Sequence, residues 1–267
     1  MGKIIAVSNQ KGGVGKTTTS VNLAAGLAYL KKKVLLVDFD PQGNATRGLN
    51  AKNNVVHSAY ELLLGNISAD ECIIHLPIPP LDLIPATIDL AGSDYQMVNR
   101  PTGKESFLKR KLDTVKDRYD FIIIDCPPSL GLLNANALTA ADSVIIPVQC
   151  EYYALEGVTQ LLSTIRNVQK HYNRKLYIEG VLLTMFDSRT NLSTEVQREV
   201  RKYFKERVYR SYIPRNVRLA EAPSHGKSIF KYDKTCIGAR AYASLAKEVI
   251  EKNSQGGNTC QKMKRQD

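Results

Sequence analysis

Short apolar runs recur along the chain and alternate with longer segments of helical periodicity. Several of the runs are rich in valine and isoleucine without alternating with polar residues, which is typical of strands covered on both faces. The predicted strands are Ile4–Val7, Val34–Val37, Leu81–Ile84, Phe121–Ile124, Val144–Val148 and Ile178–Leu183. Apolar residues at helical spacing predict helices at Thr17–Tyr29, Leu155–His171, Leu192–Arg207 and Ala239–Ile250.

This alternation of strand and helix predicts an α/β fold. We expect a doubly wound, mostly parallel sheet with helices on both faces. No linker or repeat interrupts the pattern, so residues 1–251 are predicted to form one domain. Residues 252–267 are polar and contain Gly256-Gly257, which predicts a disordered tail.

A glycine-rich segment follows the first predicted strand and leads into the first predicted helix. It reads Lys11-Gly12-Gly13-Val14-Gly15-Lys16-Thr17-Thr18. A strand–loop–helix of this kind places backbone N–H groups around phosphates and directs the helix N-terminus at them. Lys16 is expected to reach the β- and γ-phosphates, the Thr17 hydroxyl to bind Mg²⁺, and Thr18 to lie by the α-phosphate.

This string resembles the deviant Walker A motif of the ParA/MinD family of P-loop ATPases, and the chain is most similar to the short chromosomal ParA proteins, the Soj type. Further matching strings are Asp40–Thr46, Asp125–Gly131, Pro147–Gly157 and Ile213–Leu219. The resemblance implies a P-loop NTPase fold, ATP and Mg²⁺ as cofactors, and a homodimer that encloses two ATP molecules. It also implies that Lys11 contacts the phosphates bound by the other subunit, with Gly12 at the dimer seam.

Two predicted strands end in acidic residues. The second strand leads into Asp38 and Asp40, and Phe121–Ile124 ends at Asp125. Because ligands bind at the carboxyl ends of parallel strands, these carboxylates are expected beside the phosphates. By resemblance, Asp40 orients the attacking water, Asp38 supports the metal shell and Asp125 holds Mg²⁺ through water. The expected catalytic residues are therefore Lys11, Lys16 and Asp40.

The base is expected to be adenine. The strand Ile178–Leu183 is followed by Thr184-Met185-Phe186-Asp187, which lacks the Asn-Lys-x-Asp motif that reads guanine in GTPases. By resemblance, Met185 and the loop Pro214-Arg215-Asn216 line the adenine.

The formal net charge of +11 indicates a polyanionic partner, although a solvated basic surface accounts for the charge equally well. Arg198, Arg201, Lys202 and Lys205 fall at i, i+3, i+4 and i+7 of one predicted helix, where nearby glutamates can pair with them. Arg189 and Arg218 match positions that the family uses for DNA. The predicted DNA contacts are Arg189, Arg198, Arg201, Lys202, Arg218 and Lys227.

Other branches of the family fit less well. A MinD-like, membrane-associated division-site ATPase needs a C-terminal amphipathic helix with large apolar residues, whereas the segment from Lys252 onward carries one, Met263. An iron–sulfur protein needs paired cysteines, and Cys126 and Cys150 lack such spacing. No signal peptide is recognisable, so we expect a cytoplasmic protein without membrane contact.

The sequence therefore predicts an ATPase that dimerises on binding ATP and binds double-stranded DNA non-specifically on the nucleoid. No helix-turn-helix segment precedes the P-loop, so sequence-specific DNA reading is not expected. The resemblance implies chromosome or plasmid partitioning, with slow hydrolysis stimulated by a ParB-type centromere-binding protein. It also implies control of replication initiation through the initiator DnaA. The MinD-like function is the alternative.

Overall fold

A single mixed sheet organises the chain. The computed structural model describes residues 2–77, 80–98, 103–152 and 154–259. The strand order is β3-β4-β2-β5-β1-β6-β7, and every pairing is parallel except that of β3 with β4. The strands are β1 Lys3–Val7, β2 Val34–Asp38, β3 Ile74–His75, β4 Leu81–Ile84, β5 Phe121–Asp125, β6 Ser143–Gln149 and β7 Tyr177–Thr184.

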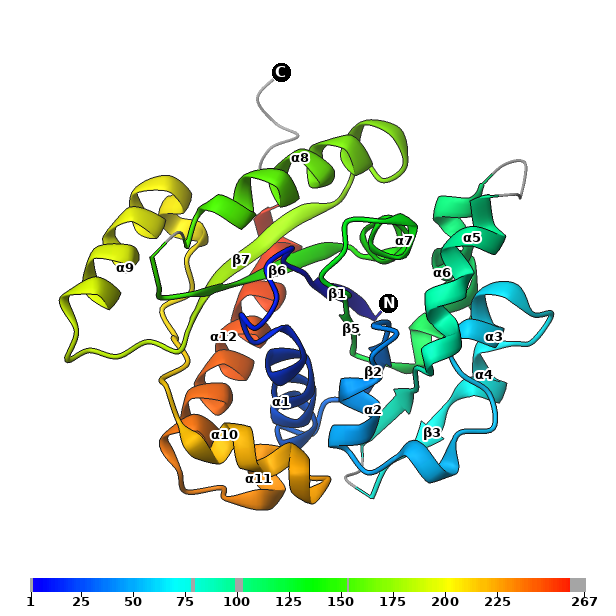
Figure 1. The fold of residues 1–267 in the computed structure, drawn as a ribbon, viewed down its shortest axis with the longest axis horizontal. Helices are drawn as coiled ribbons and strands as arrows, with labels where there is room; N and C mark the ends of the chain where they lie inside the picture. Colours follow the sequence, from blue (N-terminus) through cyan, green and yellow to red (C-terminus); the bar gives the residue numbers. More distant parts are fainter. Residues whose placement is uncertain (1, 78–79, 99–102, 153, 260–267) are drawn as a thin grey trace.

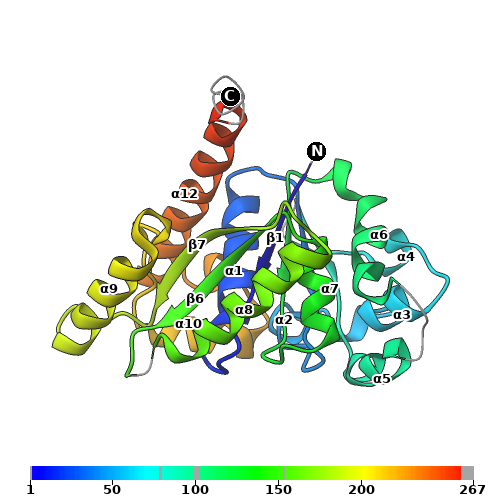
Figure 2. The same ribbon diagram turned by 90° about the horizontal axis from the view of Figure 1, so that it is seen from above.

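Helices cover both faces of the sheet (Figures 1 and 2), with α1 and α12 on one face and α7 and α8 on the other. The larger helices are α1 Lys16–Tyr29, α6 Phe107–Asp113, α7 Leu132–Ala140, α8 Glu156–His171, α9 Asn191–Phe204 and α12 Ile237–Thr259. The shorter ones are α2 Asn44–Gly48, α3 Ala59–Leu64, α4 Ala69–Cys72, α5 Ser93–Val98, α10 Val217–Glu221 and α11 Ile229–Tyr232.

Alternate residues of the central strand β1 enter two separate hydrophobic cores. Ile4 and Ala6 pack in the core beneath α7 and α8, while Ile5 and Val7 pack in the core beneath α1 and α12. All four side chains are fully buried. Burial on both faces explains why such strands appear in the sequence as unbroken apolar runs, and it confirms the predicted doubly wound α/β fold.

Some predicted boundaries were wrong. The two-residue edge strand β3 was missed because it is too short to show a pattern. The predicted helix Leu192–Arg207 ends at Phe204, because Lys205 has a φ of 50° and starts a 3₁₀ turn, so Lys205 does not continue the predicted basic face.

The C-terminal helix continues beyond the expected domain end. α12 runs to Thr259, so residues 252–259, which we expected in a disordered tail, are helical. Asn253 fastens this extension to the sheet, since its Nδ2 donates to Glu179 Oε1 of β7 at 2.7 Å. Residues 260–267 of the expected tail lie outside the described residues.

Among the described residues, no helix is both long enough and apolar enough to cross a membrane.

Gly180 of β7 provides a test of the packing of this strand. A Cβ at Gly180 would lie 2.8 Å from Cδ2 and Cζ of Tyr209, whose side chain is 1% exposed. Because a buried ring has little room to move, Gly180→Ala should cost about 1–3 kcal/mol of stability. For a domain of this size the melting temperature should fall by roughly 3–10 °C. Gly92→Ala is the control, since a Cβ there has no neighbour within 4 Å. An unchanged melting temperature for Gly180→Ala would contradict this packing.

Candidate nucleotide site

The glycine-rich loop turns sharply between β1 and α1. Gly13 and Gly15 have φ values of 75° and 87°, a region in which residues with a Cβ are strained. Gly15 is the N-cap of α1, so the helix begins at Lys16 with free N–H groups directed into the loop. The structure therefore forms the phosphate-binding turn that the sequence predicts.

Two side chains outside the motif fasten this loop to neighbouring strands. Asn9 is 2% exposed; its Nδ2 donates to Pro147 O of β6 at 2.7 Å, and its Oδ1 accepts from Lys11 N at 3.1 Å. Thr184, at the end of β7, donates from Oγ1 to Val14 O at 2.8 Å. Sequence reasoning missed both residues because neither belongs to the motif.

The two motif lysines differ in their surroundings. Lys16 is 7% exposed, and its Nζ donates to Lys11 O at 3.1 Å. Burial lowers the pKa of the Lys16 ammonium, and the negative charges of Asp125 and Asp40 oppose that shift. Lys11 is half-exposed, and within the described chain its ammonium group has no hydrogen-bond or ion-pair partner.

Three carboxylates lie at the carboxyl edge of the sheet, and the charges of two of them, Asp125 and Asp40, act on Lys16. Asp38 and Asp125 are register partners on β2 and β5, and Val7 faces Asp125 from β1. Asp38 and Asp125 are fully buried, and Asp40 is 6% exposed. Burial raises the pKa of Asp38 to about 6, which hydrogen bonds from Thr46 oppose. Burial, together with the charge of Asp38, raises the pKa of Asp125 to about 8.

Asp38 organises the segment that follows β2. Its Oδ2 accepts from Thr46 N at 2.8 Å and from Thr46 Oγ1 at 2.7 Å. Asp40 Oδ1 accepts from Gln42 N at 2.9 Å, and Asp40 O accepts from Gly43 N at 2.8 Å. These contacts fold the chain into the start of α2 and hold the Asp40 carboxylate at the edge of the phosphate site.

Asp125 has the features of a magnesium-supporting residue. Its Oδ1 accepts from Ser20 Oγ at 2.9 Å, but its buried Oδ2 has no hydrogen-bond partner in the described structure. A buried carboxylate oxygen without a partner is costly, and Mg²⁺ with its bound waters would satisfy it. Thr17 is near enough to Asp125 for its hydroxyl to oppose the rise in pKa. The residues therefore fit a Mg²⁺ ion between Thr17 and Asp125.

The predicted base-binding residues come together beside the P-loop. Met185 has a φ of 50°, so the chain turns abruptly after β7. Phe186 N then donates to Ile213 O at 3.0 Å, and Arg215 N donates to Phe186 O at 3.2 Å. Asn216 uses its side chain to cap α10, accepting from Arg218 N at 2.8 Å. The loop Pro214–Asn216 thus lies next to Met185, as expected if the two segments bind the base together.

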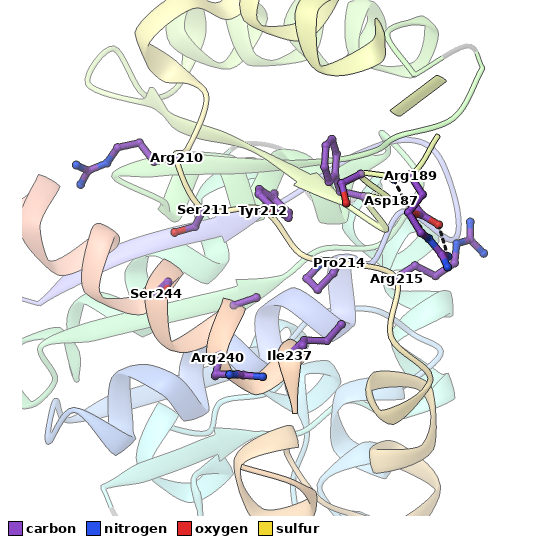
Figure 3. A pocket seen from close by; sticks show the side chains of 13 residues that line it. Asp187, Arg189, Arg210, Ser211, Tyr212, Pro214, Arg215, Ile237, Arg240 and Ser244 are labelled. Carbon is purple, nitrogen blue, oxygen red and sulfur yellow. Dashed lines mark hydrogen bonds and ion pairs between the residues drawn. The ribbon is translucent and has the colours of Figure 1, made fainter. Parts of the chain in front are cut away.

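An arginine-lined groove opens next to this loop (Figure 3). It has a volume of about 740 Å³ and lies between the turn after β7, the segment 210–215 and the first turns of α12. It is lined by four arginines: Arg189, Arg210, Arg215 and Arg240. Arg189 is a predicted DNA contact and Arg215 a predicted base contact, whereas Arg210 and Arg240 were assigned to neither set. The groove joins arginines from three separate segments, which no local sequence pattern indicates.

The other predicted DNA contacts are spread over several elements. Arg198, Arg201 and Lys202 are exposed on α9, and Arg218 is exposed on α10. Lys227 lines a groove of about 500 Å³ together with Thr17, Thr18 and Arg47, and Leu219 of α10 lines the same groove. The predicted contacts therefore come from several elements of the C-terminal half of the chain.

Two of these arginines already have acidic partners. Arg189 Nη2 lies 2.8 Å from Asp187 Oδ2, and this contact lowers the pKa of the Asp187 carboxyl to about 2. Arg218 Nη1 lies 2.9 Å from Glu221 Oε2. Such exposed pairs are weak, so a phosphate group can compete with the carboxylate for the guanidinium.

Comparisons with known proteins identify the family of this chain. The family model AAA_31, an AAA domain, matches residues 2–178. The chain is 62% identical over 251 residues to the sporulation initiation inhibitor protein Soj of Bacillus subtilis, which covers 93% of this chain and 98% of that protein. It is 50% identical over 255 residues to the chromosome-partitioning ATPase Soj of Treponema pallidum, covering 96% of this chain and 100% of the relative.

A solved structure has the same fold. The cobyrinic acid a,c-diamide synthase of Mycobacterium smegmatis, with bound ADP and magnesium, superposes with a TM-score of 0.84 at 38% identity and covers 96% of this chain and 97% of that one. Together with the P-loop geometry, these relatives show that the chain belongs to the ParA/MinD family of P-loop ATPases and to its Soj group of chromosome-partitioning ATPases.

Proposed function

We propose that this protein is an ATP-driven dimerisation switch that binds DNA non-specifically and partitions a chromosome or plasmid. The observation that carries the proposal is the contrast between the two P-loop lysines. Lys16 is buried and faces its own phosphate site, whereas Lys11 is half-exposed without a partner in the described chain. A cation displayed beside a phosphate site is suited to the phosphates of a second subunit.

Gly12 supports a subunit contact at the same place. It is exposed, its φ is not in the left-handed region, and a Cβ added there has no neighbour within 4 Å. Neither backbone strain nor packing inside the subunit therefore requires glycine at this position. A second P-loop approaching closely would require it.

Each residue of the site has its own role in the proposed hydrolysis of ATP. The loop N–H groups and Lys16 bind the phosphates, and Asp40 orients the attacking water. The partner subunit supplies a second Lys11 ammonium, which stabilises the charge that develops on the transferred phosphoryl group. Thr17 and Asp125 would hold Mg²⁺, with Asp38 supporting the shell, and the ion neutralises phosphate charge when it is bound. Thr18 lies next to the α-phosphate.

The base is adenine, read by Met185 and the loop Pro214–Asn216. Contacts between Phe186 and the backbone of this loop keep the two segments together. The base therefore lies between the P-loop and the arginine-lined groove.

DNA binding follows from the joining of two basic surfaces. The predicted contacts are the exposed cations of α9 and α10 together with Arg189 and Lys227, and the groove adds Arg210 and Arg240. Closing the dimer doubles the number of phosphate contacts, so affinity should rise steeply with ATP and fall with salt. Because the contacts are with the phosphate backbone, binding does not depend on sequence.

In the cell, we propose, the ATP dimer associates with the nucleoid and a ParB-type partner stimulates its slow hydrolysis. Control of replication initiation through DnaA is part of the same proposal. Support comes from the relatives named for chromosome partitioning and for inhibition of sporulation initiation.

Substitution of Gly12 tests the dimer. Gly12→Val should abolish ATP-dependent dimerisation, because the added side chain occupies the space that the second P-loop needs, while ATP affinity of the monomer stays within about twofold. Light scattering after size exclusion measures dimerisation, in an Asp40→Ala background that slows turnover, and calorimetry measures ATP binding. Gly92→Ala is the matched control, since its Cβ also has no neighbour within 4 Å. A Gly12→Val protein that dimerises as wild type would rule out this seam.

Binding to a random DNA duplex tests the function. The wild type should bind with ATP and not with ADP, and affinity should fall by roughly 10³-fold or more between 50 and 200 mM salt if six or more phosphates are contacted. Lys16→Ala, which removes the phosphate ligand, should bind DNA in neither state. Absence of DNA binding in every nucleotide state, together with ATP-dependent binding to anionic liposomes, would favour the MinD-like function instead.

A further inference from the structure

We infer that Glu248 of α12 is a positioning residue for nucleotide-base recognition. Its buried carboxylate holds the segment 210–216 in the shape that places Pro214 beside Met185. This inference rests on the proposed location of the base at that loop. Glu248 is on a different element from every residue assigned to the nucleotide, so it acts through the loop and not on the ligand.

The segment is hydrogen-bonded to β7 at both of its ends. Tyr209 N donates to Val181 O at 3.0 Å, and Ile213 N donates to Leu183 O at 2.8 Å. Beyond Ile213, the contacts with Phe186 continue the pairing past the end of the strand. Between these ends the N–H groups of Arg210 and Ser211 point away from β7, so this stretch needs other acceptors.

Glu248 supplies both acceptors. Oε1 accepts from Arg210 N at 2.9 Å, and Oε2 accepts from Ser211 N at 3.0 Å. The side chain is 5% exposed, and burying a carboxylate is costly unless strong donors surround it. Two backbone N–H groups, with the Arg210 Nε 3.8 Å away, provide that environment. The carboxylate and the segment therefore fix each other's position.

Figure 3 shows that the segment 210–215 and α12 face each other across the groove. Ser211, Tyr212 and Pro214 lie along the segment, and Ser244 and Arg240 lie on the facing turns of α12. Only Tyr212 and Ile213 separate Ser211 from Pro214, so a displacement at Ser211 strains the hydrogen bond from Ile213 N to Leu183 O that holds the start of the base loop. Within the described segment, the neighbouring Glu251 hydrogen-bonds only with the side chain of Arg210, whose Nη2 lies 3.0 Å from Glu251 Oε2. Unlike Glu248, it accepts no hydrogen bond from a backbone N–H of the segment.

Replacing the carboxylate should lower the affinity for nucleotides that carry a base. Glu248→Gln keeps the size of the side chain but turns one acceptor into a donor, which faces a backbone N–H. In most molecules the segment 210–216 should then leave the arrangement that binds the base. The apparent affinity for ADP falls in proportion to the fraction of molecules that keep this arrangement. If about one molecule in ten remains competent, the Kd for ADP rises about tenfold.

The test compares a ligand with a base and one without. Calorimetry measures the binding of Mg²⁺·ADP and of Mg²⁺·tripolyphosphate to the full chain. Glu248→Gln should raise the Kd for ADP about tenfold and leave the Kd for tripolyphosphate within twofold, and the single-turnover rate of bound ATP should stay within twofold of wild type. Glu251→Gln, the matched control, should change neither Kd. Glu248→Asp keeps the charge and should lose less ADP affinity than Glu248→Gln.

Each contrary result has a distinct meaning. An unchanged Kd for ADP in Glu248→Gln overturns the inference, and so does an equal loss for both ligands, which indicates general destabilisation. If Glu248→Gln does not fold, Glu248→Asp decides the question: a loss of affinity for ADP alone supports the inference, and wild-type ADP affinity or an equal loss for both ligands overturns it. If the wild type binds ADP no more tightly than tripolyphosphate, the base does not lie at this loop and the inference falls. Failure of the wild type to hydrolyse ATP would instead remove the proposed function.

Discussion

The burial of Asp38, Asp40 and Asp125 at one edge of the sheet, with Lys16 close to two of them, is the constraint on which the site depends. Parallel strands β2 and β5 end side by side, so Asp38 and Asp125 are brought together out of contact with water. Like charges in such a place repel each other and lose hydration. Thr46, Ser20 and the lysine offset part of that cost, yet one oxygen of Asp125 stays without a partner. The buried negative charge at this edge of the sheet therefore favours the binding of a cation together with the phosphates that the cation coordinates.

The P-loop and the predicted base loop are both held at this carboxyl edge of the sheet. β1 carries the P-loop into the centre of the sheet. The Asn9 side chain, next to the loop, donates to the backbone of β6, and the Thr184 side chain of β7 donates to the loop backbone. The turn after β7 brings the predicted base loop alongside, and a buried carboxylate of α12 holds Arg210 and Ser211 at the start of the segment that leads into it. The P-loop, the predicted base loop and the arginine-lined groove thus lie along one side of the fold. This arrangement gives a physical route by which bound ATP and a basic outer surface influence each other.

The sequence was sufficient wherever the signal is local. The strand, the glycines and the helix start at Lys16 are contiguous, and a buried strand ending in Asp125 is recognisable without neighbours. Contacts across the chain were not predictable in this way. Ser20 donates a hydrogen bond to Asp125, which is 105 residues away in the sequence, and Asn9 donates one to Pro147, which is 138 residues away. The extension of α12 was missed because its polar composition hides a helix that side chains anchor to β7.

The most direct test of this account measures how Mg²⁺ stabilises the ADP-bound protein. The melting temperature is recorded with ADP, before and after adding Mg²⁺, for the wild type and for Asp125→Asn. The amide keeps an acceptor for Ser20 and removes the buried charge, so the variant should fold and be no less stable than wild type without the metal. The account predicts that Mg²⁺ raises the melting temperature of the wild type and has little effect on Asp125→Asn. An equal rise in both proteins would contradict the assignment of Asp125 as the residue that holds the metal.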